Sequence, residues 1–398
     1  MNKLELLAPA GDLEKLKTAI IYGADAVYFG GKKFSLRARA SNFSMDDIKE
    51  AVDYAHDRHK KVYVTVNMVP HDSDFIGLKE YLMELENMKV DAIICASRAI
   101  LSLAKKVAPK MEVHVSTQQT TTNSEAIKYW QKANCDRLVL AREVQYSDLV
   151  EICKKTDLPL EVFIHGGMCA NYSGRCVISN LLTNRDANRG GCAQSCRWNY
   201  HLYHNDELID QDDFLFSFGS KDLCVVDCLE DILKTNVASL KIEGRMKTAY
   251  YIATVVKGYR QLIDEFEKEG KISKECLEEN KKLIKRSSNR EAFNGFYPGL
   301  PNRDGQIYNN IVTANQSYVA NVLEYSDGIA TIEVRNYFKT GDKLRIFNPK
   351  GKDEYFVLEQ MQDLDGELVE IANKPMQKLK IKVPVEVSKF TFITTGDE

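Results

Sequence analysis

The chain has 398 residues and a net charge of −3, with 44% hydrophobic and 28% charged residues. This composition is ordinary for a globular protein of two or three domains, and it excludes a uniformly basic nucleic-acid binder, although a local patch could still contact RNA. No stretch approaches the roughly 18 apolar residues of a membrane helix, and the start carries no apolar signal segment. We therefore expect a cytoplasmic protein without membrane contact. There, the ten cysteines indicate metal binding, catalysis or packing rather than disulfides.

Short apolar runs alternate with helical patterns through the first two thirds of the chain. Helical segments such as DLEKLKTAIIYG begin at an Asp or a Ser, as N-caps do. Eight runs have the character of buried strands: 4–9, 26–31, 61–67, 92–97, 112–117, 137–142, 160–166 and 239–244. Buried strands that alternate with helices predict a closed (β/α)8 TIM-like barrel over residues 1–285. A doubly wound open sheet is the alternative, but APAGD after the first run lacks its glycine-rich fingerprint.

The connection after the seventh strand, residues 167–238, is much longer than the others. Barrels of this class carry their chemistry on the loops that follow the strands, so this insertion is predicted to be functional. Residues 286–310 are rich in Gly, Pro and Asn and predict a linker. Short strands and turns from 311 to 398 predict a small C-terminal β-barrel domain.

The insertion is rich in cysteine. Its first four cysteines have the spacing C-x6-C-x15-C-x3-C: Cys169, Cys176, Cys192 and Cys196. Cys224 follows in SKDLC, at a predicted helix start where the dipole would stabilise a thiolate. Four thiolates at one site suit zinc or an iron–sulfur cluster, and the spacing does not decide between them. Packing as small hydrophobes is the alternative for Cys169 and Cys176.

Several motifs together resemble the collagenase-like peptidase family U32. They are HGGMCANYSGRC, GGCAQSCRW, SKDLC and SLKIEGRMK, with APAGD, AVYFGG, HVSTQQTTTN and NREAFNGFYPG elsewhere. The resemblance covers essentially the whole chain. It implies a [4Fe–4S] cluster held by Cys169, Cys176, Cys192 and Cys224, with Cys196 as the alternate fourth ligand. It also implies oxygen-independent hydroxylation that requires prephenate. For the members that act on tRNA, the implied product is 5-hydroxyuridine at the wobble position.

The name of the family suggests a peptidase instead. The sequence contains no H-E-x-x-H, and NYSGR around Ser173 does not match G-x-S-x-G. Cys169 and His165 could form a Cys–His pair, although a nucleophile needs no companion cysteines. A zinc-stabilised RNA-binding protein without redox chemistry is the third interpretation.

Polar residues stand at most strand ends, where barrel side chains enter a site. Three are predicted to be catalytic: His165, Glu243 and Arg245. His165 would transfer protons or brace the cysteine-bearing insertion, and Glu243 would act as a base or pair with an arginine. Prephenate has two carboxylates, which arginine binds well. The predicted substrate-binding residues are Arg39, Asn67, Gln118, Arg142 and Arg175.

An RNA substrate would be recognised at an unpaired base through aromatic stacking and phosphate contacts. Arg290 and Phe296 lie in NREAFNGFYPG, just after the basic segment KKLIKR, and Arg189 and Arg197 lie in the insertion. These four residues are predicted to bind tRNA. A solvated helix face and a packed linker are the alternative.

Overall fold

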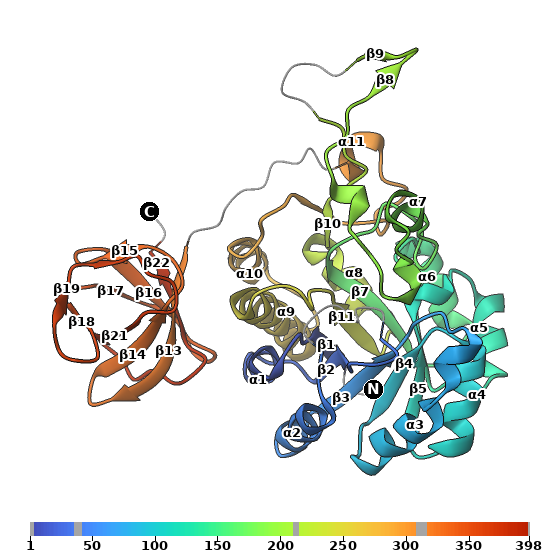
Figure 1. Ribbon diagram of the computed structural model, residues 1–398, viewed down its shortest axis with the longest axis horizontal. Helices are drawn as coiled ribbons and strands as arrows, with labels where there is room; N and C mark the ends of the chain where they lie inside the picture. Colours follow the sequence, from blue (N-terminus) through green and yellow to red (C-terminus); the bar gives the residue numbers. More distant parts are fainter. Residues whose placement is uncertain (1–3, 36–41, 210–214, 308–316, 397–398) are drawn as a thin grey trace.

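A closed parallel barrel forms the larger part of the molecule (Figure 1). The computed structural model describes residues 4–35, 42–209, 215–307 and 317–396. The barrel strands are β1 (Glu5–Pro9), β2 (Ala26–Gly30), β3 (Lys61–Val66), β4 (Ala92–Cys95), β5 (Glu112–Val115), β6 (Arg137–Val139), β7 (Leu160–Gly166) and β11 (Ser239–Ile242). Each pairs with its neighbour in order, and β11 pairs with both β1 and β7 and so closes the ring. The predicted (β/α)8 barrel is confirmed.

Helices cover the outside of the barrel. They are α1 (Leu13–Ile21), α2 (Met45–His56), α3 (Leu78–Asn87), α4 (Arg98–Val107), α5 (Ser124–Gln131), α6 (Tyr146–Lys154), α8 (Leu229–Leu233), α9 (Ala249–Glu269) and α10 (Lys274–Lys285). The N-caps are those expected from sequence: Asp12 accepts a hydrogen bond from the Lys15 backbone, and Ser44 forms a capping box with Asp47. Such caps satisfy N–H groups that a helix start leaves without partners.

The inside of the barrel is packed, with an apolar side and a charged side. Leu7, Ala26, Tyr28, Tyr63, Ala92 and Ile94 form a buried apolar cluster. Arg137, Glu161 and Lys241 are also buried inside. Because a packed barrel is not a pore, a ligand must enter at the carboxyl ends of the strands.

The segment between β7 and β11 lies at the carboxyl ends of the barrel strands. It contains α7 (Ile178–Thr183), the hairpin of β8 (Tyr203–His204) and β9 (Glu207–Leu208), and β10 (Asp222–Cys224). β10 runs antiparallel to the end of β7, and β12 (Ala292–Phe293) pairs with β10. The segment also contains three single helical turns, η3 (Ala187–Arg189), η4 (Ser195–Arg197) and η5 (Val226–Cys228). Three further short turns lie outside this segment: η1 (Asp72–Phe75), η2 (Thr117–Gln119) and α11 (Arg303–Gln306). The hairpin stands clear of the barrel (Figure 1).

The C-terminal domain is a curled antiparallel sheet. Its strands, in the order in which they pair, are β17 (Glu354–Val357), β16 (Lys343–Phe347), β22 (Phe392–Thr395), β13 (Tyr318–Ser326), β14 (Ile329–Val334), β21 (Lys378–Lys382), β18 (Met361–Gln362) and β19 (Leu368–Val369). A separate ladder joins β15 (Phe338–Lys339) to β20 (Ile371–Ala372). In the described residues the sheet is a half-barrel, whose two edges do not pair, rather than a closed barrel.

Aromatic rings join this domain to the barrel. Tyr22, at the end of α1, stacks on Phe347 with ring centroids 5.3 Å apart, and Tyr250 of α9 stacks on Tyr318 at 4.9 Å. The Lys257 Nζ donates to the Asn348 carbonyl at 2.8 Å. The two domains therefore share a packed interface. Within the described part of the chain, no helix has the length and apolar character needed to cross a bilayer.

Candidate active site at the barrel mouth

A cavity of about 210 Å³ opens at the carboxyl ends of the barrel strands. Its volume is below the roughly 300–1,000 Å³ of pockets for drug-sized ligands, so it suits one small molecule or one base. Its lining includes Tyr28, Thr65, Asn67, Ser116, Gln118, Arg142, Glu143, Phe163, Cys169, Ser173, Lys241, Glu243 and Arg245. The structure thus brings together Asn67, Gln118, Arg142, Glu243, Arg245 and Cys169, which the strand-end pattern or the cysteine spacing had singled out.

Arg245 is buried on one wall of the cavity. Its Nη1 donates to Ser35 Oγ at 3.3 Å and to Thr65 Oγ1 at 3.2 Å. A Cβ on residue 30 would lie 2.7 Å from Arg245 Nη1, so Gly30 leaves the space that the guanidinium needs. The arginine is therefore held in one place beside the cavity.

Two glycines, the last residue of β7 and the residue after it, bring the opposite wall together. Gly166 has φ +106°, and a Cβ there would lie 2.3 Å from the Glu243 carbonyl oxygen. The Gly167 N–H donates to Glu243 Oε2 at 3.2 Å, and Arg142 donates to the Gly167 carbonyl. The Arg142 guanidinium also lies 3.9 Å from the Phe163 ring centroid. This HGG segment therefore fixes the positions of both Glu243 and Arg142.

Amide and hydroxyl groups form the third side. Asn67 Nδ2 donates to Gln118 Oε1 at 2.8 Å, and Ser116 Oγ donates to the same oxygen at 2.9 Å. Ser173, on the cysteine-bearing insertion, donates its N–H and its hydroxyl to Glu143 at 3.0 and 2.9 Å. The insertion is thus fastened to the ends of the barrel strands.

The thiols of Cys176 and Cys192 both influence the pKa of Cys169 and that of Cys196, and Cys169 also influences that of Cys196. Cys169 is exposed by area, yet desolvation raises the pKa of its thiol; Arg142 opposes the rise, and Cys192 and Cys176 add to it. Burial likewise raises the pKa of Cys196, and Cys169, Cys192 and Cys176 add to the rise. Four thiols in one neighbourhood are a donor set that fits an iron–sulfur cluster.

Cys224 lines a different cavity, a groove of about 990 Å³ between α10 and the strands β10 and β12. Burial raises the pKa of its thiol, which lies 3.8 Å from the Tyr259 hydroxyl. Over the described residues, no three or more His, Cys, Asp and Glu side chains converge closely enough for one metal ion. In a multi-iron cluster each thiolate binds a different iron, so cluster ligands stand further apart than ligands of a single ion.

His165 faces away from the cavity. It packs between β7 and α9, with ring centroids 5.8 Å from Tyr251 and 5.6 Å from Tyr259. The pairing of β7 with β11 skips Ile164, and this bulge places His165 on the outer face of the barrel. Burial lowers its pKa to about 3, so the ring is neutral at physiological pH.

The other predicted arginines lie around the insertion rather than in the cavity. The Arg175 Nε donates to Thr120 Oγ1 at 3.1 Å on the surface, and Arg189 pairs with Asp74. Arg197 and Arg290, far apart in sequence, both approach Asp222 Oδ1, at 3.9 and 3.7 Å. Phe296 packs against the barrel core. Arg39 lies outside the described residues.

Two lysines of the site were not predicted from the sequence. Lys247 Nζ lies 3.7 Å from Asp222 Oδ2, so three cations surround one carboxylate at the rim. Lys241 lies inside the barrel, where its Nζ is 2.7 Å from Glu161 Oε1. For Lys241 the available signal was the alternation along β11, since Ser239, Lys241 and Glu243 all fall on the inward face.

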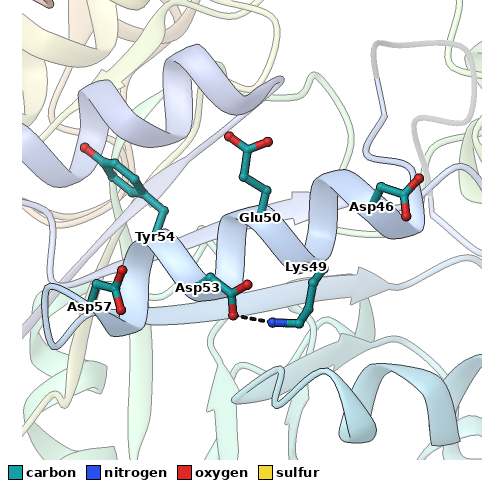
Figure 2. A pocket seen from close by; sticks show the side chains of 6 residues that line it. All are labelled: Asp46, Lys49, Glu50, Asp53, Tyr54 and Asp57. Carbon is teal, nitrogen blue, oxygen red and sulfur yellow. Dashed lines mark hydrogen bonds and ion pairs between the residues drawn. The ribbon is translucent and has the colours of Figure 1, made fainter.

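A hollow on the outer surface of α2 has a different character (Figure 2). Four carboxylates line it, from Asp46, Glu50, Asp53 and Asp57, with Lys49 paired to Asp53. An acidic surface of this kind repels phosphate. Lys49 is therefore a suitable control position for experiments on anion binding elsewhere.

Comparison with known proteins identifies the family. The model of Peptidase family U32 matches residues 11–307, and that of the Peptidase family U32 C-terminal domain matches residues 314–393. The chain belongs to peptidase family U32. This confirms the family indicated by the cysteine-bearing motifs.

Proteins similar to this chain carry different names. "tRNA hydroxylation protein P1" of Bacillus subtilis (strain 168) is 40% identical over 406 residues, 99% of this chain and 95% of its own length. "23S rRNA 5-hydroxycytidine C2501 synthase" of Escherichia coli (strain K12) is 38% identical over 264 residues, 66% of this chain and 40% of its own length. "Collagenase" of Porphyromonas gingivalis (strain ATCC BAA-308 / W83) is 29% identical over 405 residues, 97% of this chain and 95% of its own length.

Proposed function

We propose that this U32 protein is an oxygen-independent, prephenate-dependent tRNA hydroxylase that makes 5-hydroxyuridine at the wobble position in the cytoplasm. The observation that carries the proposal is the 40% identity to a tRNA hydroxylation protein over 99% of the chain. RNA hydroxylation is also consistent with the relative named as an rRNA 5-hydroxycytidine synthase. The small cavity, with its amides and arginines, has the size and polarity for one base or one small acid.

A [4Fe–4S] cluster on the insertion would supply electron transfer for this reaction. Cys169, Cys176 and Cys192 are its proposed ligands. The influence of Cys169, Cys192 and Cys176 on the pKa of Cys196 supports Cys196 as the fourth ligand, whereas the family resemblance supports Cys224. Arg142, which opposes the rise in the pKa of Cys169, would help to keep that sulfur anionic.

The chain's own residues would bind and orient both substrates. Arg142 and Arg245 on the cavity walls offer guanidinium groups to carboxylates. The Asn67–Gln118 pair offers amide groups to the remaining polar groups of the same small acid. Arg197, Lys247 and Arg290 surround Asp222 with a net charge of about +2, which favours RNA phosphates beside the mouth.

The first experiment is to measure iron and acid-labile sulfide on protein purified without oxygen, then 5-hydroxyuridine in tRNA. We expect about four of each per chain and hydroxylation that depends on prephenate. Cys176→Ser should abolish both the cluster and the modification, whereas Cys276→Ser on α10 should change neither. A Cys176→Ser protein that still modifies tRNA would refute the proposal. Cys196→Ser and Cys224→Ser, compared for iron content, identify the fourth ligand.

A peptidase is the second candidate, because of the family name and the collagenase relative. Its nucleophile and base would be Cys169 and His165, yet His165 packs against α9 on the outer face of the barrel. A peptidase would keep its activity with a chelator and with Cys192→Ser. A zinc-stabilised RNA-binding protein, the third candidate, would be colourless and stable in air.

A further inference from the structure

A lysine stands at the inner end of the cavity, where the sequence pattern suggested only a buried strand. Lys241 is 4% exposed and lines the cavity together with Arg142 and Arg245. Its Nζ lies 4.4 Å from the Tyr28 ring centroid and 5.4 Å from that of Phe163. Burying an ammonium group costs several kcal/mol unless it is paired and hydrogen-bonded, so its place in the barrel needs a reason.

A buried ladder of charges holds Lys241 from below. Its Nζ donates to Glu161 Oε1 at 2.7 Å, and Glu161 Oε2 accepts from Arg137 Nη1 at 3.3 Å. Arg137 also donates to Glu5, whose Oε1 accepts from Ser239 Oγ at 2.9 Å. The two acids and two bases balance, so the ladder is neutral as a whole.

The ladder uses only part of the hydrogen-bonding capacity of the lysine. An ammonium group has three N–H donors. Among the described residues, Lys241 Nζ donates a hydrogen bond to Glu161 alone. The Nε of Arg142 is buried as well and lacks a hydrogen-bond partner in the same part of the chain. Two cationic groups on the cavity lining thus have N–H donors to give to a ligand.

The unused hydrogen-bond donors of the lining, rather than its net charge, favour an anionic ligand. Lys241, Arg142 and Arg245 contribute three positive charges, which are balanced by Glu161, the partner of Lys241, and by the two lining carboxylates of Glu143 and Glu243. Both carboxylates already accept hydrogen bonds from backbone N–H groups, Glu143 from Ser173 and Glu243 from Gly167. The cations are therefore the groups best suited to bind a small acid in about 210 Å³.

We infer that Lys241 is a binding residue that holds one carboxylate of a small dicarboxylic acid at the inner end of the cavity. Arg142 and Arg245 take the second carboxylate nearer the mouth. This assignment rests on the proposed function, in which prephenate supplies the two carboxylates. Glu161 and Arg137 act as positioning residues that keep the ammonium group directed at the ligand.

The test compares prephenate binding by wild type, Lys241→Met and the double variant Lys241→Met/Glu161→Gln, each with its cluster. The double variant removes both partners of the ion pair and so leaves no unpaired buried carboxylate. We expect prephenate Kd, measured by calorimetry, to rise at least about tenfold in both variants, the loss of roughly one charge-assisted contact. Iron content and tRNA Kd should stay at wild-type values, and Lys49→Met on α2 should bind prephenate normally.

The outcomes separate this inference from the function on which it rests. If wild type binds prephenate and hydroxylates tRNA, and both Lys241 variants bind prephenate equally well, the role of Lys241 is refuted and the function stands. If wild type does not bind prephenate, both are refuted. A fall in kcat with unchanged prephenate Kd would also overturn the binding role.

Discussion

His165 illustrates how one bulge changes what a residue can do. It lies at the end of β7, but the skipped pairing at Ile164 turns it toward Tyr251 and Tyr259 of α9. A neutral ring in that position braces the strand against the helix. Direct proton transfer in the cavity would require the ring to leave this packing.

This burial predicts how stability varies with pH. The pKa of His165 is about 3 in the folded protein and about 6.5 in an unfolded chain. Between these two pH values only the unfolded chain takes up the proton. The contribution of the neutral His165 to the free energy of unfolding is therefore complete above about pH 6.5 and is lost as the pH falls. When the pH falls from about 7.5 to about 5.5, the free energy of unfolding should drop by about 1.4 kcal/mol more in wild type than in His165→Phe. Denaturant unfolding at both pH values measures this, and equal losses would contradict the assignment.

The position of the Lys247 charge predicts how RNA binding depends on salt. It joins Arg197 and Arg290 around Asp222 beside the cavity mouth. Removing one phosphate contact lowers the slope of log K against log salt by about 1. Lys247→Ala should show this change in tRNA titrations at several salt concentrations, and Lys49→Ala, on the acidic surface of α2, should not. An unchanged slope for Lys247→Ala would show that this rim does not contact the RNA phosphates.

At the level of elements, the turn after β7 depends on a glycine. Gly166 combines a positive φ with a close approach to the Glu243 carbonyl, whereas Gly270, which caps α9, has φ +72° and open space around it. Gly270→Ala should therefore cost about 1 kcal/mol through backbone strain alone. Gly166→Ala should cost about 3 kcal/mol or more, because overlap adds to strain. Unfolding free energies of the two variants test this, and equal costs would contradict it.

The strand pattern predicted most of this architecture and only part of the site. The eight strands and the long insertion follow from apolar runs and their spacing, so the residues at strand ends, such as Asn67 and Arg142, could be placed at one mouth. His165 could not, because a bulge is a property of pairing between strands and not of one strand's sequence. Lys241 was missed because a single lysine leaves its strand apolar in appearance. The spacing grouped Cys196 with Cys169, but the choice between Cys196 and Cys224 as fourth ligand depends on the path of the insertion, which spacing does not fix.

At the scale of the whole molecule, the C-terminal half-barrel is packed onto the barrel rather than tethered to it. The aromatic contacts of Tyr22 and Tyr250 with Phe347, Phe392 and Tyr318 lie on α1 and α9, on the outside of the barrel. α9 also contacts His165 through Tyr251 and Tyr259. One helix thus carries both the domain interface and the support of β7, and the domain reinforces the wall of the site from outside.

The packed interface, to which both α1 and α9 contribute, predicts that the two domains unfold together. The Tyr22 ring stacks on Phe347, and its hydroxyl shares its one proton between the Phe347 and Phe390 carbonyl oxygens, at 3.0 and 2.9 Å. Truncating a buried aromatic side chain costs about 3–5 kcal/mol. Tyr22→Ala should therefore weaken the interface enough to split one calorimetric transition into two, whereas Tyr337→Ala, at an exposed site of the C-terminal domain, should keep one. Two transitions in wild type would show instead that the domains are energetically independent.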